Sequence, residues 1–316
     1  MNYNEALKAL PETEKNVLAV LSGGMDSSIM TMLLIERYGK DKVLALSYDY
    51  GQKQREELNR AAHLCTLLDI PHNILDLNIL GEIAKPISAN IGGTDVVMPT
   101  IQDVLGDPQP KTYVPFRNLI LLSLTMAQAE ASDASHVFTG LQVHDQYGYW
   151  DTSQRFVDSI NAVAEQNRTH SVKIEAPFAH LSKYEELMLC QEMDKLHLLA
   201  STLTCYNPDE DGKSCGVCPS CAERVAAFMQ TYMIDPIVFC DMQLAYCKQM
   251  SGPLDLSKHH LPSGYIICHQ QAPTDVHVGS GTHPAMHEGH MLWHNGIIKE
   301  DCVKALREEL NDIATW

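Results

Sequence analysis

The first half of the chain alternates short apolar runs with longer amphipathic segments, and this alternation constrains the fold more than any other feature. Short apolar runs bounded by polar residues are typical of buried strands, and the longer segments have the periodicity of helices. The pattern predicts an α/β fold with a doubly wound, mostly parallel sheet that helices cover on both faces. The predicted strands are residues 17–21, 43–48, 72–77 and 137–141, and the predicted helices are residues 26–38, 53–68 and 118–131.

A glycine- and serine-rich string, SGGMDSS at residues 22–28, directly follows the first predicted strand and opens the first predicted helix. Gly23 and Gly24 let the backbone approach an anion closely, and the N–H groups at a helix N-terminus stabilise negative charge. Asp26 would repel a phosphate, so we expect it to hold magnesium or to cap the helix. The expected ATP-binding residues of this loop are Leu21, Ser22, Gly23, Gly24, Met25, Asp26, Ser27 and Ser28.

This string matches neither the lysine-containing phosphate loop of common nucleotide hydrolases nor the glycine pattern of dinucleotide-binding folds. A glycine-rich turn with a serine or aspartate helix cap is the alternative interpretation. The string resembles the pyrophosphate loop of the N-type ATP pyrophosphatases, which have an adenine nucleotide α-hydrolase-like fold. The resemblance implies that ATP is a cosubstrate, that the chain adenylates its acceptor, and that the loop holds the departing pyrophosphate.

Four cysteines lie within residues 205–221 in the pattern C-x9-C-x2-C-x2-C. Thiolates at C-x2-C spacing suit one tetrahedral metal, and four thiolates without histidine are typical of a structural zinc site that has no open position. An iron–sulfur cluster is the alternative. We expect a zinc knuckle with a helix over residues 221–228 anchoring it, and the predicted ligands are Cys205, Cys215, Cys218 and Cys221.

Composition excludes several classes of function. The formal net charge is −17, with 40 acidic against 23 basic residues, which argues against a surface that coats nucleic acid. No apolar run approaches the length of a membrane span, and residues 1–15 do not resemble a secretory signal. We expect a cytoplasmic protein without direct nucleic-acid or membrane contacts, whose ten cysteines are reduced or bind metal.

Further motifs follow the phosphate loop in a fixed order: DYGQ at 49–52, TYVPFRN at 112–118, EAP at 175–177, HLSK at 180–183, and then the cysteine knuckle. In this order they closely resemble the 7-cyano-7-deazaguanine synthases, the QueC family, from about residue 15 to about residue 236. The resemblance implies that residues 1–236 form a synthase-like domain and that residues 237–316 form an extension beyond it.

The resemblance also implies a reaction. Members of that family convert 7-carboxy-7-deazaguanine and ammonia to 7-cyano-7-deazaguanine, an intermediate of queuosine and related deazaguanines, with ATP and a bound zinc. A carboxylate is a poor electrophile, so adenylation supplies the leaving group that lets ammonia form an amide. A second activation, of the amide oxygen, then allows dehydration to the nitrile. The family likeness further favours a homodimer.

Several polar residues lie where ligands bind in such folds. Asp49 and Gln52 follow the second predicted strand, at the carboxyl edge of the sheet, and are expected to contact ATP; a polar turn is the alternative. Arg117 and Asn118 open a predicted helix, and the Arg117 guanidinium suits a carboxylate or a phosphate unless it forms a surface salt bridge. Lys183 is expected to reach phosphate, although its position also suits the start of a helix. The predicted catalytic residues are Ser22, Asp26, Arg117 and Lys183, and the predicted substrate residues are Arg117, Asn118, Asp145 and Tyr149.

The loop expected to touch the purine-like ring departs from the family pattern. The family usually has D-Y-S-G-Y-P-D-C-R, whereas this chain has DQYGYWDTS at residues 145–153, and it has Phe116 where the family usually has alanine. Tyr149 or Trp150 is able to stack on the ring, and an ordinary half-buried aromatic is the alternative for both. These departures bear on the exact substrate or product more than on the class of reaction.

The C-terminal extension is rich in histidine. Residues 269–274 and 283–296 weakly resemble an internal piece of class II glutamine amidotransferase domains, but no cysteine follows Met1 to act as the N-terminal nucleophile of that chemistry. The alternatives are a non-catalytic packing subdomain, part of a glutaminase completed by a partner chain, and a metal site that uses histidines four residues apart. A short closing helix is predicted over residues 301–313.

Two rival hypotheses keep the same fold. In one, the enzyme makes a different deazaguanine product, such as an amide or an amidine, or adenylates another acceptor, with a glutaminase as a possible source of ammonia. In the other, the chain is a zinc-stabilised nucleotide-binding protein without turnover. The presence of Asp26 and the complete loop argue against the second rival.

Overall fold

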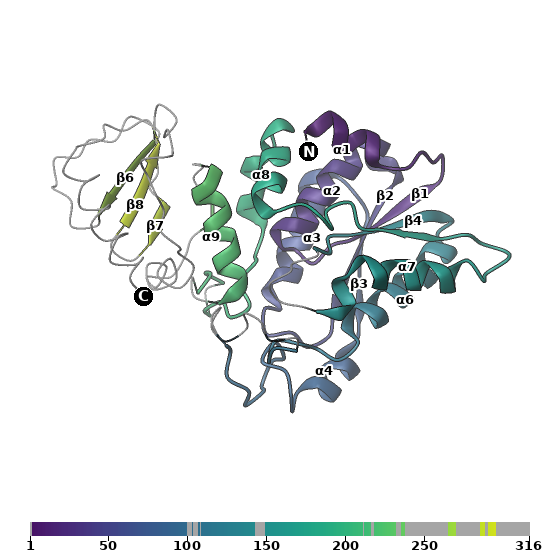
Figure 1. Ribbon diagram of the computed structural model, residues 1–316, viewed down its shortest axis with the longest axis horizontal. Coiled ribbons are helices and arrows are strands. Elements are labelled where there is room, and N and C mark those ends of the chain that lie inside the picture. The colour runs from purple at the N-terminus through teal and green to yellow at the C-terminus, as the bar shows by residue number, and fades with distance from the viewer. Residues whose placement is uncertain are drawn as a thin grey trace. The chain divides into compact units, whose positions relative to one another are not determined.

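The structure is a computed structural model that describes most of the first 237 residues and three strands beyond them (Figure 1). The chain divides into two compact units, which comprise residues 1–99 with 103–204 and residues 100–102 with 205–316. The predicted domain boundary after residue 236 lies within the second unit and stays a prediction. The described residues are 2–99, 103, 107, 109–142, 149–210, 212–215, 218–231, 235–237, 265–269, 285–287 and 290–294.

The first unit is built on a five-stranded sheet in the order β3-β2-β1-β4-β5, and every neighbouring pair of strands is parallel. The four predicted strands are present, so the predicted α/β class with a mostly parallel sheet is confirmed. The fourth strand begins and ends earlier than predicted, because the chain turns at Gly140. β5 was not predicted, since three residues are too few to show a periodic pattern. The strands are β1 (Asn16–Val20), β2 (Val43–Asp49), β3 (His72–Asp76), β4 (Ala134–Thr139) and β5 (Lys173–Glu175).

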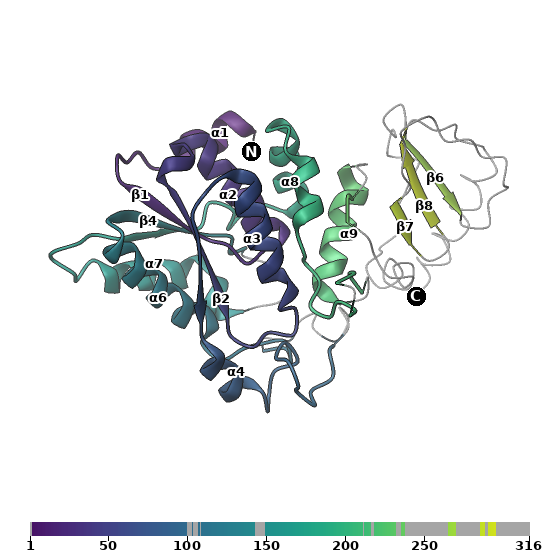
Figure 2. The ribbon, with the colours of Figure 1, turned by 180° about the vertical axis from the view of Figure 1, so that it is seen from behind.

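Helices cover both faces of this sheet (Figures 1 and 2). α2 (Met25–Tyr38) and α3 (Glu56–Leu68) lie on one face, and α6 (Arg117–Ala131) and α7 (Gln154–Ala164) lie on the other. The chain adds strands outward from β1 in one direction and then in the opposite direction, so right-handed crossovers place the two helix pairs on opposite faces. Leu18 is buried in the core cluster on the α6 and α7 side of the sheet.

The change of direction in strand order falls between β1 and β4. Loops that leave these two strands start at the same carboxyl edge and lead to helices on opposite faces, which is where ligands bind in open α/β sheets. The two loops touch: a Cβ placed on Gly140, directly after β4, would lie 3.2 Å from the backbone nitrogen of Ser27 in the loop after β1. The topology therefore brings residues 22–28 and the segment after β4 to one place.

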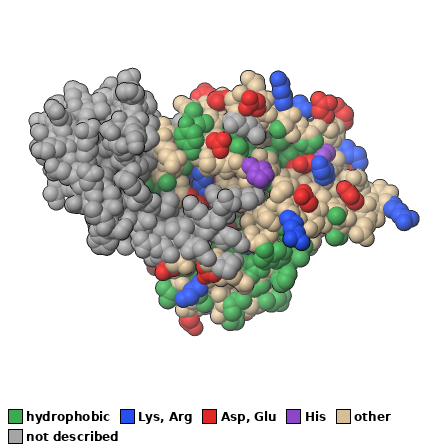
Figure 3. All heavy atoms as spheres, in the orientation of Figure 1, with side chains coloured by type: hydrophobic (Ala, Val, Ile, Leu, Met, Phe, Trp, Pro, Cys, Tyr) green, Lys and Arg blue, Asp and Glu red, His purple; other side chains and the backbone are tan. Residues whose placement is uncertain are grey.

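Shorter helices complete the first unit. α3 begins three residues later than predicted, because the chain between β2 and α3 folds into a turn rather than a helical start. α4 exposes Ile79 and Ile83, and hydrophobic side chains gather at the lower edge of the molecule where α4 lies (Figure 3). The remaining elements are α1 (Tyr3–Ala9), α4 (Asn78–Ala84), α8 (Lys183–Glu192) and the 3-10 turns η1 (Lys40–Lys42), η2 (Trp150–Thr152) and η3 (Leu196–Ser201).

The second unit contains α9 (Pro219–Thr231), which confirms and extends the helix predicted over residues 221–228. Arg224 on α9 is fully buried, and its Nε and Nη2 atoms donate to the Asp235 carboxylate at 2.7 and 2.8 Å. This bidentate ion pair fixes the chain that leaves the helix. None of the described helices is long and apolar enough to cross a membrane.

A second, antiparallel sheet has the order β6-β8-β7, with β6 (Tyr265–His269), β7 (Ala285–His287) and β8 (His290–His294). Residues four apart on a strand are separated by about 13 Å. One of the predicted metal sites required His290 and His294 to lie one turn apart on a helix. They lie on a strand instead, so that prediction is wrong. The helix predicted over residues 301–313 lies outside the described residues.

Candidate active site and metal centre

The loop after β1 is held in shape by its own serines. Ser22 Oγ accepts a hydrogen bond from the Gly24 nitrogen at 3.2 Å and lies 2.9 Å from Ser27 Oγ, and Ser28 Oγ donates to the Gly24 carbonyl at 2.6 Å. Gly24 is the N-cap of α2, and no side chain caps this helix. The expectation that Asp26 caps α2 is therefore wrong, and the first N–H groups of the helix keep their capacity to bind an anion.

Gly23 is required by close packing. Its φ is +89°, and a Cβ at this position would lie 2.1 Å from the Glu57 carbonyl oxygen. Any side chain would displace the start of α3 from the loop. The Gly23 carbonyl also accepts a hydrogen bond from the Leu203 nitrogen at 2.9 Å, which ties the loop to the end of the first unit.

Lys183 starts a helix, as one of its two interpretations has it, and its predicted contact with phosphate stays a prediction. It is the first residue of α8, where Ser182 and Glu185 form a capping box. Its Nζ also lies 2.7 Å from Asp26 Oδ2 and 3.2 Å from Gln142 Oε1, and only 7% of the side chain is exposed. A cation at a helix N-terminus opposes the helix dipole. The Asp26 carboxylate offsets that cost and holds the ammonium group beside the phosphate loop.

Gln142 and Glu186 complete this network, and the sequence did not single out either residue. Glu186 is fully buried and accepts a hydrogen bond from Gln142 Nε2. Burial, and then the Asp26 charge, raise the pKa of Glu186 well above its ordinary value, and its carboxyl shares a hydrogen bond with Asp26. The position of Glu186, three residues after Lys183 on one helix, is the signal that would have found it.

The polar side chains of the turn after β2 form hydrogen bonds and an ion pair within residues 48–55. Gln52 is buried, its Oε1 accepts from the Tyr50 nitrogen at 2.9 Å, and its Nε2 donates to the Tyr48 carbonyl at 2.9 Å. Asp49 Oδ2 lies 2.6 Å from Arg55 Nη2. This geometry matches the polar-turn interpretation for Gln52. ATP contacts from Asp49 and Gln52 stay predictions.

Arg117 and the buried Glu57 both lie near Tyr50 at this edge of the sheet. Burial raises the pKa of Glu57, in the first turn of α3, to about 8, while the hydrogen bond from Gln52 and the Arg117 charge lower it. Arg117 Nη1 donates to the hydroxyl of Tyr50 at 3.3 Å. Sequence reasoning missed Glu57, although its spacing of four from Ala61 places it on the buried side of a predicted helix.

Asn118 joins the start of α6 to the segment after β4. Its backbone nitrogen donates to Asp151 Oδ2 at 3.3 Å, and its Nδ2 donates to the Asp151 carbonyl at 3.0 Å. Tyr149 forms a hydrogen bond with Thr112 through its hydroxyl and stacks on Tyr113 with ring centroids 6.3 Å apart. The predicted substrate roles of Asn118 and Tyr149 stay predictions, and Asp145 lies outside the described residues.

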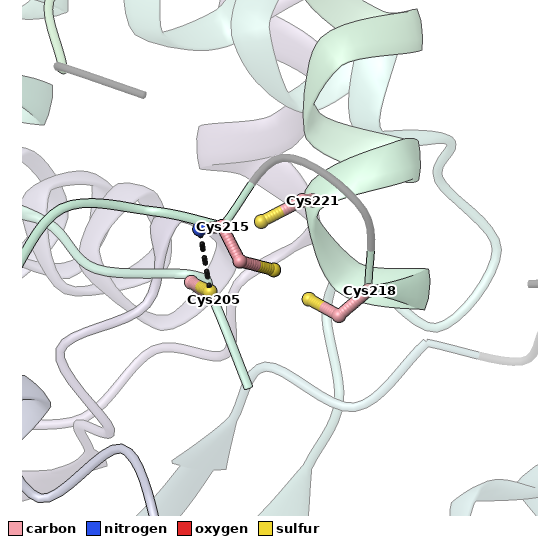
Figure 4. Close-up of side chains that lie close together, drawn as sticks. All are labelled: Cys205, Cys215, Cys218 and Cys221. Carbon is pink, nitrogen blue, oxygen red and sulfur yellow. Dashed lines mark hydrogen bonds between the residues drawn. The ribbon is translucent and has the colours of Figure 1, made fainter. Parts of the chain in front are cut away.

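The four predicted metal ligands converge in the second unit (Figure 4). Their sulfur atoms all lie within 4.8 Å of one another, close to the spacing of about 3.8 Å that Zn–S bonds of 2.3 Å give in a tetrahedron. Backbone nitrogens of Asn207 and Cys215 donate to the Cys205 sulfur at 3.2 Å, and the Tyr206 nitrogen donates to the Cys218 sulfur at 3.4 Å. Such donors favour thiolates, so the donor set fits a bound metal ion.

A glycine-rich loop at the carboxyl edge of a parallel sheet, with a buried lysine paired to a partly buried aspartate beside it, defines a nucleotide-binding α/β protein of the pyrophosphate-loop class. A sequence profile described as "Queuosine biosynthesis protein QueC" matches residues 16–232. The chain belongs to this family.

Curated relatives agree with this assignment. The 7-cyano-7-deazaguanine synthase of Marinomonas sp. (strain MWYL1) is 38% identical over 227 residues, which cover 72% of this chain and 99% of the relative. The synthase of that name from Chromobacterium violaceum is 32% identical over 230 residues, with 72% and 94% covered. Among solved structures, the U34-tRNA thiolase NcsA from Methanococcus maripaludis has a TM-score of 0.40 and 17% identity, with 61% of this chain and 63% of that chain covered. The last likeness is too distant to support an inference.

Proposed function

We propose that this chain converts 7-carboxy-7-deazaguanine and ammonia to 7-cyano-7-deazaguanine with ATP, in the biosynthesis of queuosine or a related deazaguanine. The main support is the family membership over residues 16–232, and the phosphate loop lies where that function needs it, at the carboxyl edge between β1 and β4. The proposal makes the chain a ligase that forms carbon–nitrogen bonds.

The reaction proceeds through two activations. The substrate carboxylate attacks the α-phosphorus of ATP, the bond to the β-phosphate oxygen breaks, and pyrophosphate leaves. Ammonia then displaces AMP from the acyl adenylate and forms the amide, with loss of one proton. The amide oxygen then attacks the α-phosphorus of a second ATP, which expels a second pyrophosphate and gives an adenylated imidate. Departure of AMP with loss of the remaining N–H protons leaves the nitrile.

The residues of the phosphate loop have the first role in this scheme. The N–H groups at the start of α2, with Ser22 and Ser27, bind the departing pyrophosphate and stabilise its growing charge. Lys183 releases Asp26 and pairs with a phosphate oxygen instead. Asp26 would be the residue that holds a magnesium ion, which would supply neutralisation of the phosphate charge. Arg117 orients the carboxylate of the substrate, and the family resemblance adds Asn118, Asp145 and Tyr149 as further substrate residues.

Zinc is the metal we propose for the cysteine cluster. Four sulfur ligands leave no open position, so the metal has a structural role and contributes to the stability of the second unit. An iron–sulfur cluster is the alternative that a metal analysis would reveal. The homodimer, the glutaminase partner and the cytoplasmic location stay predictions.

One observation favours a different product as the second candidate. Residues 145–153 depart from the usual family pattern at the place where we expect the purine-like ring, so an amide or an amidine is the alternative product. Incubation of the purified chain with 7-carboxy-7-deazaguanine, ATP and ammonium, followed by mass spectrometry, distinguishes these outcomes. A product with the nitrile mass is expected, and an active protein that yields only the amide or amidine mass would refute the first candidate.

A further inference from the structure

Two aromatic side chains that contact each other remain exposed near the carboxyl edge of the sheet. Phe116 is 54% exposed and Trp150 is 43% exposed, whereas Phe138, Phe156 and Phe178 of the same unit are buried. The rings of Phe116 and Trp150 meet edge to face, with centroids 5.3 Å apart and planes inclined by 70°. Burial of such rings is strongly favourable, so a preformed exposed pair suggests that a ligand covers it.

The pair is fixed by its surroundings. The Tyr113 hydroxyl accepts hydrogen bonds from the Phe116 backbone nitrogen and from Trp150 Nε1, both at 3.1 Å. The Trp150 ring also packs edge-on against Phe156, with centroids 5.4 Å apart. The rings are therefore held in one arrangement before any ligand arrives, which lowers the entropic cost of binding.

The backbone of Phe116 is strained. Its φ of +53° and ψ of +23° lie in the left-handed region, which bulky residues rarely adopt. Glycine would take this conformation without cost, and Phe116 directly precedes Arg117 at the start of α6. Strain of this kind persists mainly where a side chain serves a site.

The topology brings both aromatic residues to the edge where the phosphate loop lies. α6 and α7 run antiparallel to the strands they cover, so both helices begin at the carboxyl edge of the sheet. Phe116 is the N-cap of α6, and Trp150 lies in the 3-10 turn that leads into α7. The segment that contains Trp150 follows Gln142, which the Lys183 network holds beside the phosphate loop.

We propose that Phe116 and Trp150 form a stacking subsite for the flat ring of the deazaguanine substrate. This inference rests on the proposed function. The indole supplies a face for the ring, Phe116 borders it, and Arg117 lies next along the chain to meet the carboxylate. Tyr149 is less suited to this role, because its hydroxyl contacts Thr112 and its ring already stacks on Tyr113.

The pair also accounts for two departures from the family pattern. Phe116 replaces the usual alanine and Trp150 replaces the usual proline, and the two residues contact each other although they are far apart in the sequence. The two changes thus form one structural unit. The departures from the family pattern thus fall in the proposed ring-binding part of the site. The phosphate loop at residues 22–28 keeps the family pattern.

The test measures binding and turnover of the full chain. Titration calorimetry with 7-carboxy-7-deazaguanine, with and without a non-hydrolysable ATP analogue, gives the affinity of wild type, Trp150→Leu, Trp150→Phe and Phe116→Gly. Loss of a stacked ring should weaken binding of the deazaguanine about tenfold in Trp150→Leu and in Phe116→Gly, and Trp150→Phe should retain most of the affinity. The KM for ATP should change less than about twofold, because the phosphate loop is untouched.

Phe116→Gly is the most informative variant, because glycine relieves the strained backbone while the ring is removed. It should therefore melt no lower than wild type, so weaker binding cannot be attributed to unfolding. Val163→Ala, which trims an exposed side chain on α7, is the matched control. Unchanged deazaguanine affinity in Trp150→Leu and Phe116→Gly would overturn the subsite, as would a change in oligomeric state with unchanged affinity, since the pair would then be a subunit contact.

Turnover separates this inference from the proposed function. A wild-type chain that binds the deazaguanine through the pair but yields no nitrile supports the subsite and refutes the proposed reaction. A chain that makes the nitrile with equal substrate affinity in all variants supports the reaction and refutes the subsite. A chain that does not bind the deazaguanine at all overturns both.

Discussion

Asp26 lies at the meeting point of three charged or polar groups in the first unit. Its carboxylate pairs with Lys183 at 2.7 Å and shares a hydrogen bond with the carboxyl of the buried Glu186. Its position in the first turn of α2 places it beside the N–H groups that we expect to bind pyrophosphate. At the scale of single residues, the charge of Asp26 and the protonation of nearby carboxyls should therefore govern activity and its dependence on pH.

Asp26→Asn should abolish turnover while the fold is retained. The amide has the shape of the carboxylate but neither its charge nor its affinity for magnesium, so pyrophosphate release should fall about 100-fold or more. A colorimetric pyrophosphate assay measures the loss, and circular dichroism checks the fold. Persistence of near-wild-type release in this variant would refute the role of Asp26. Absence of ATP turnover in both wild type and the variant would support the rival hypothesis that the chain binds nucleotide without turnover.

Glu57→Gln should change the dependence of stability on pH. The folded pKa of Glu57, about 8, lies above the reference value of 4.5. The buried neutral form therefore favours the fold below about pH 4.5, and this contribution is lost as pH rises towards 8, because the unfolded chain ionises first. Glutamine cannot ionise, so the melting temperature of Glu57→Gln relative to wild type should rise between pH 5 and pH 8.5. Glu56→Gln, the neighbouring and more exposed residue, is the control, and an equal trend in both variants would contradict the prediction.

At the scale of elements, the starts of two helices shape the phosphate-loop region of the first unit, and a cysteine cluster lies in the second unit. α2 begins at Gly24, which no side chain caps, and α8 begins with a capping box that fixes Lys183. The cysteine cluster and α9 provide the anchor of the second unit. A single substitution can remove the cap of α8 or one ligand of the cysteine cluster.

Ser182→Ala should weaken α8 and disturb Lys183 together. The Ser182 hydroxyl accepts a hydrogen bond from the Glu185 nitrogen, and loss of such a cap costs about 1 kcal/mol. We expect a lower melting temperature and a higher KM for ATP, with a smaller loss of turnover than Lys183→Met causes. Ser182→Thr keeps the hydroxyl and should behave as wild type. A higher KM in the threonine variant would show that the cap is not the cause.

Cys218→Ser should lose both the metal and stability. A hydroxyl is a poor zinc ligand, so the metal content measured by plasma mass spectrometry should fall from about one equivalent to well below it. Chelation of wild type should lower the melting temperature in the same direction. Cys65→Ser, which alters a buried cysteine outside the cluster, should keep its metal. Full metal content in Cys218→Ser would refute the four-cysteine site, and iron in wild type would identify the cluster alternative.

At the scale of the whole molecule, charge is the dominant feature. The formal net charge of −17 is spread over a chain whose site must bind further anions, the phosphates of ATP and a carboxylate. Self-repulsion among surface carboxylates opposes the compact state and also the approach of these substrates. The local cations Lys183 and Arg117 lie at the carboxyl edge, where they reduce this repulsion.

Moderate salt should therefore stabilise the protein. Screening shortens the Debye length from about 20–30 Å near 0.01–0.02 M to about 8 Å near 0.15 M, which weakens repulsion among separated carboxylates. We expect the melting temperature to rise by about 2–5 °C over that range, equivalent to about 1 kcal/mol. Sodium chloride and potassium chloride should act alike in differential scanning fluorimetry. A fall in melting temperature would show that the surface ion pairs outweigh net repulsion.

Much of the architecture was predictable because it depends on periodicity along the chain. β1, β2 and β3 each began or ended within a residue or so of the prediction, since each is a short apolar run next to a long helix. β5, α1 and α4 were missed, because they have three to seven residues and their boundaries depend on what they pack against. α7, which has 11 residues, was also not predicted. The position of the loop at residues 22–28 and the convergence of the four cysteines were predictable, because each group is contiguous or nearly so in the sequence.

The parts of the site that the sequence did not reveal are those formed between elements. Gln142 comes from the segment after β4 and hydrogen-bonds to Glu186 and Lys183 of α8, which in turn lie beside Asp26 of α2. These residues come together because β1 and β4 are neighbours in the sheet. Phe116 and Trp150 likewise meet only through the packing of two loops. No sequence period places such residues together.

The sequence by itself determined the α/β class, the clustering of the four cysteines and the family, and it predicted the phosphate loop, because each depends on residue type and spacing. Tertiary structure decided the burial of Glu186 beside Asp26, which raises the pKa of Glu186, the hydrogen bonds of Gln52 within its own turn, and the exposure of the aromatic pair. The physical reason is that burial, charge and strain at one side chain are set by neighbours distant in the chain, and only the folded sheet brings those neighbours within hydrogen-bonding distance.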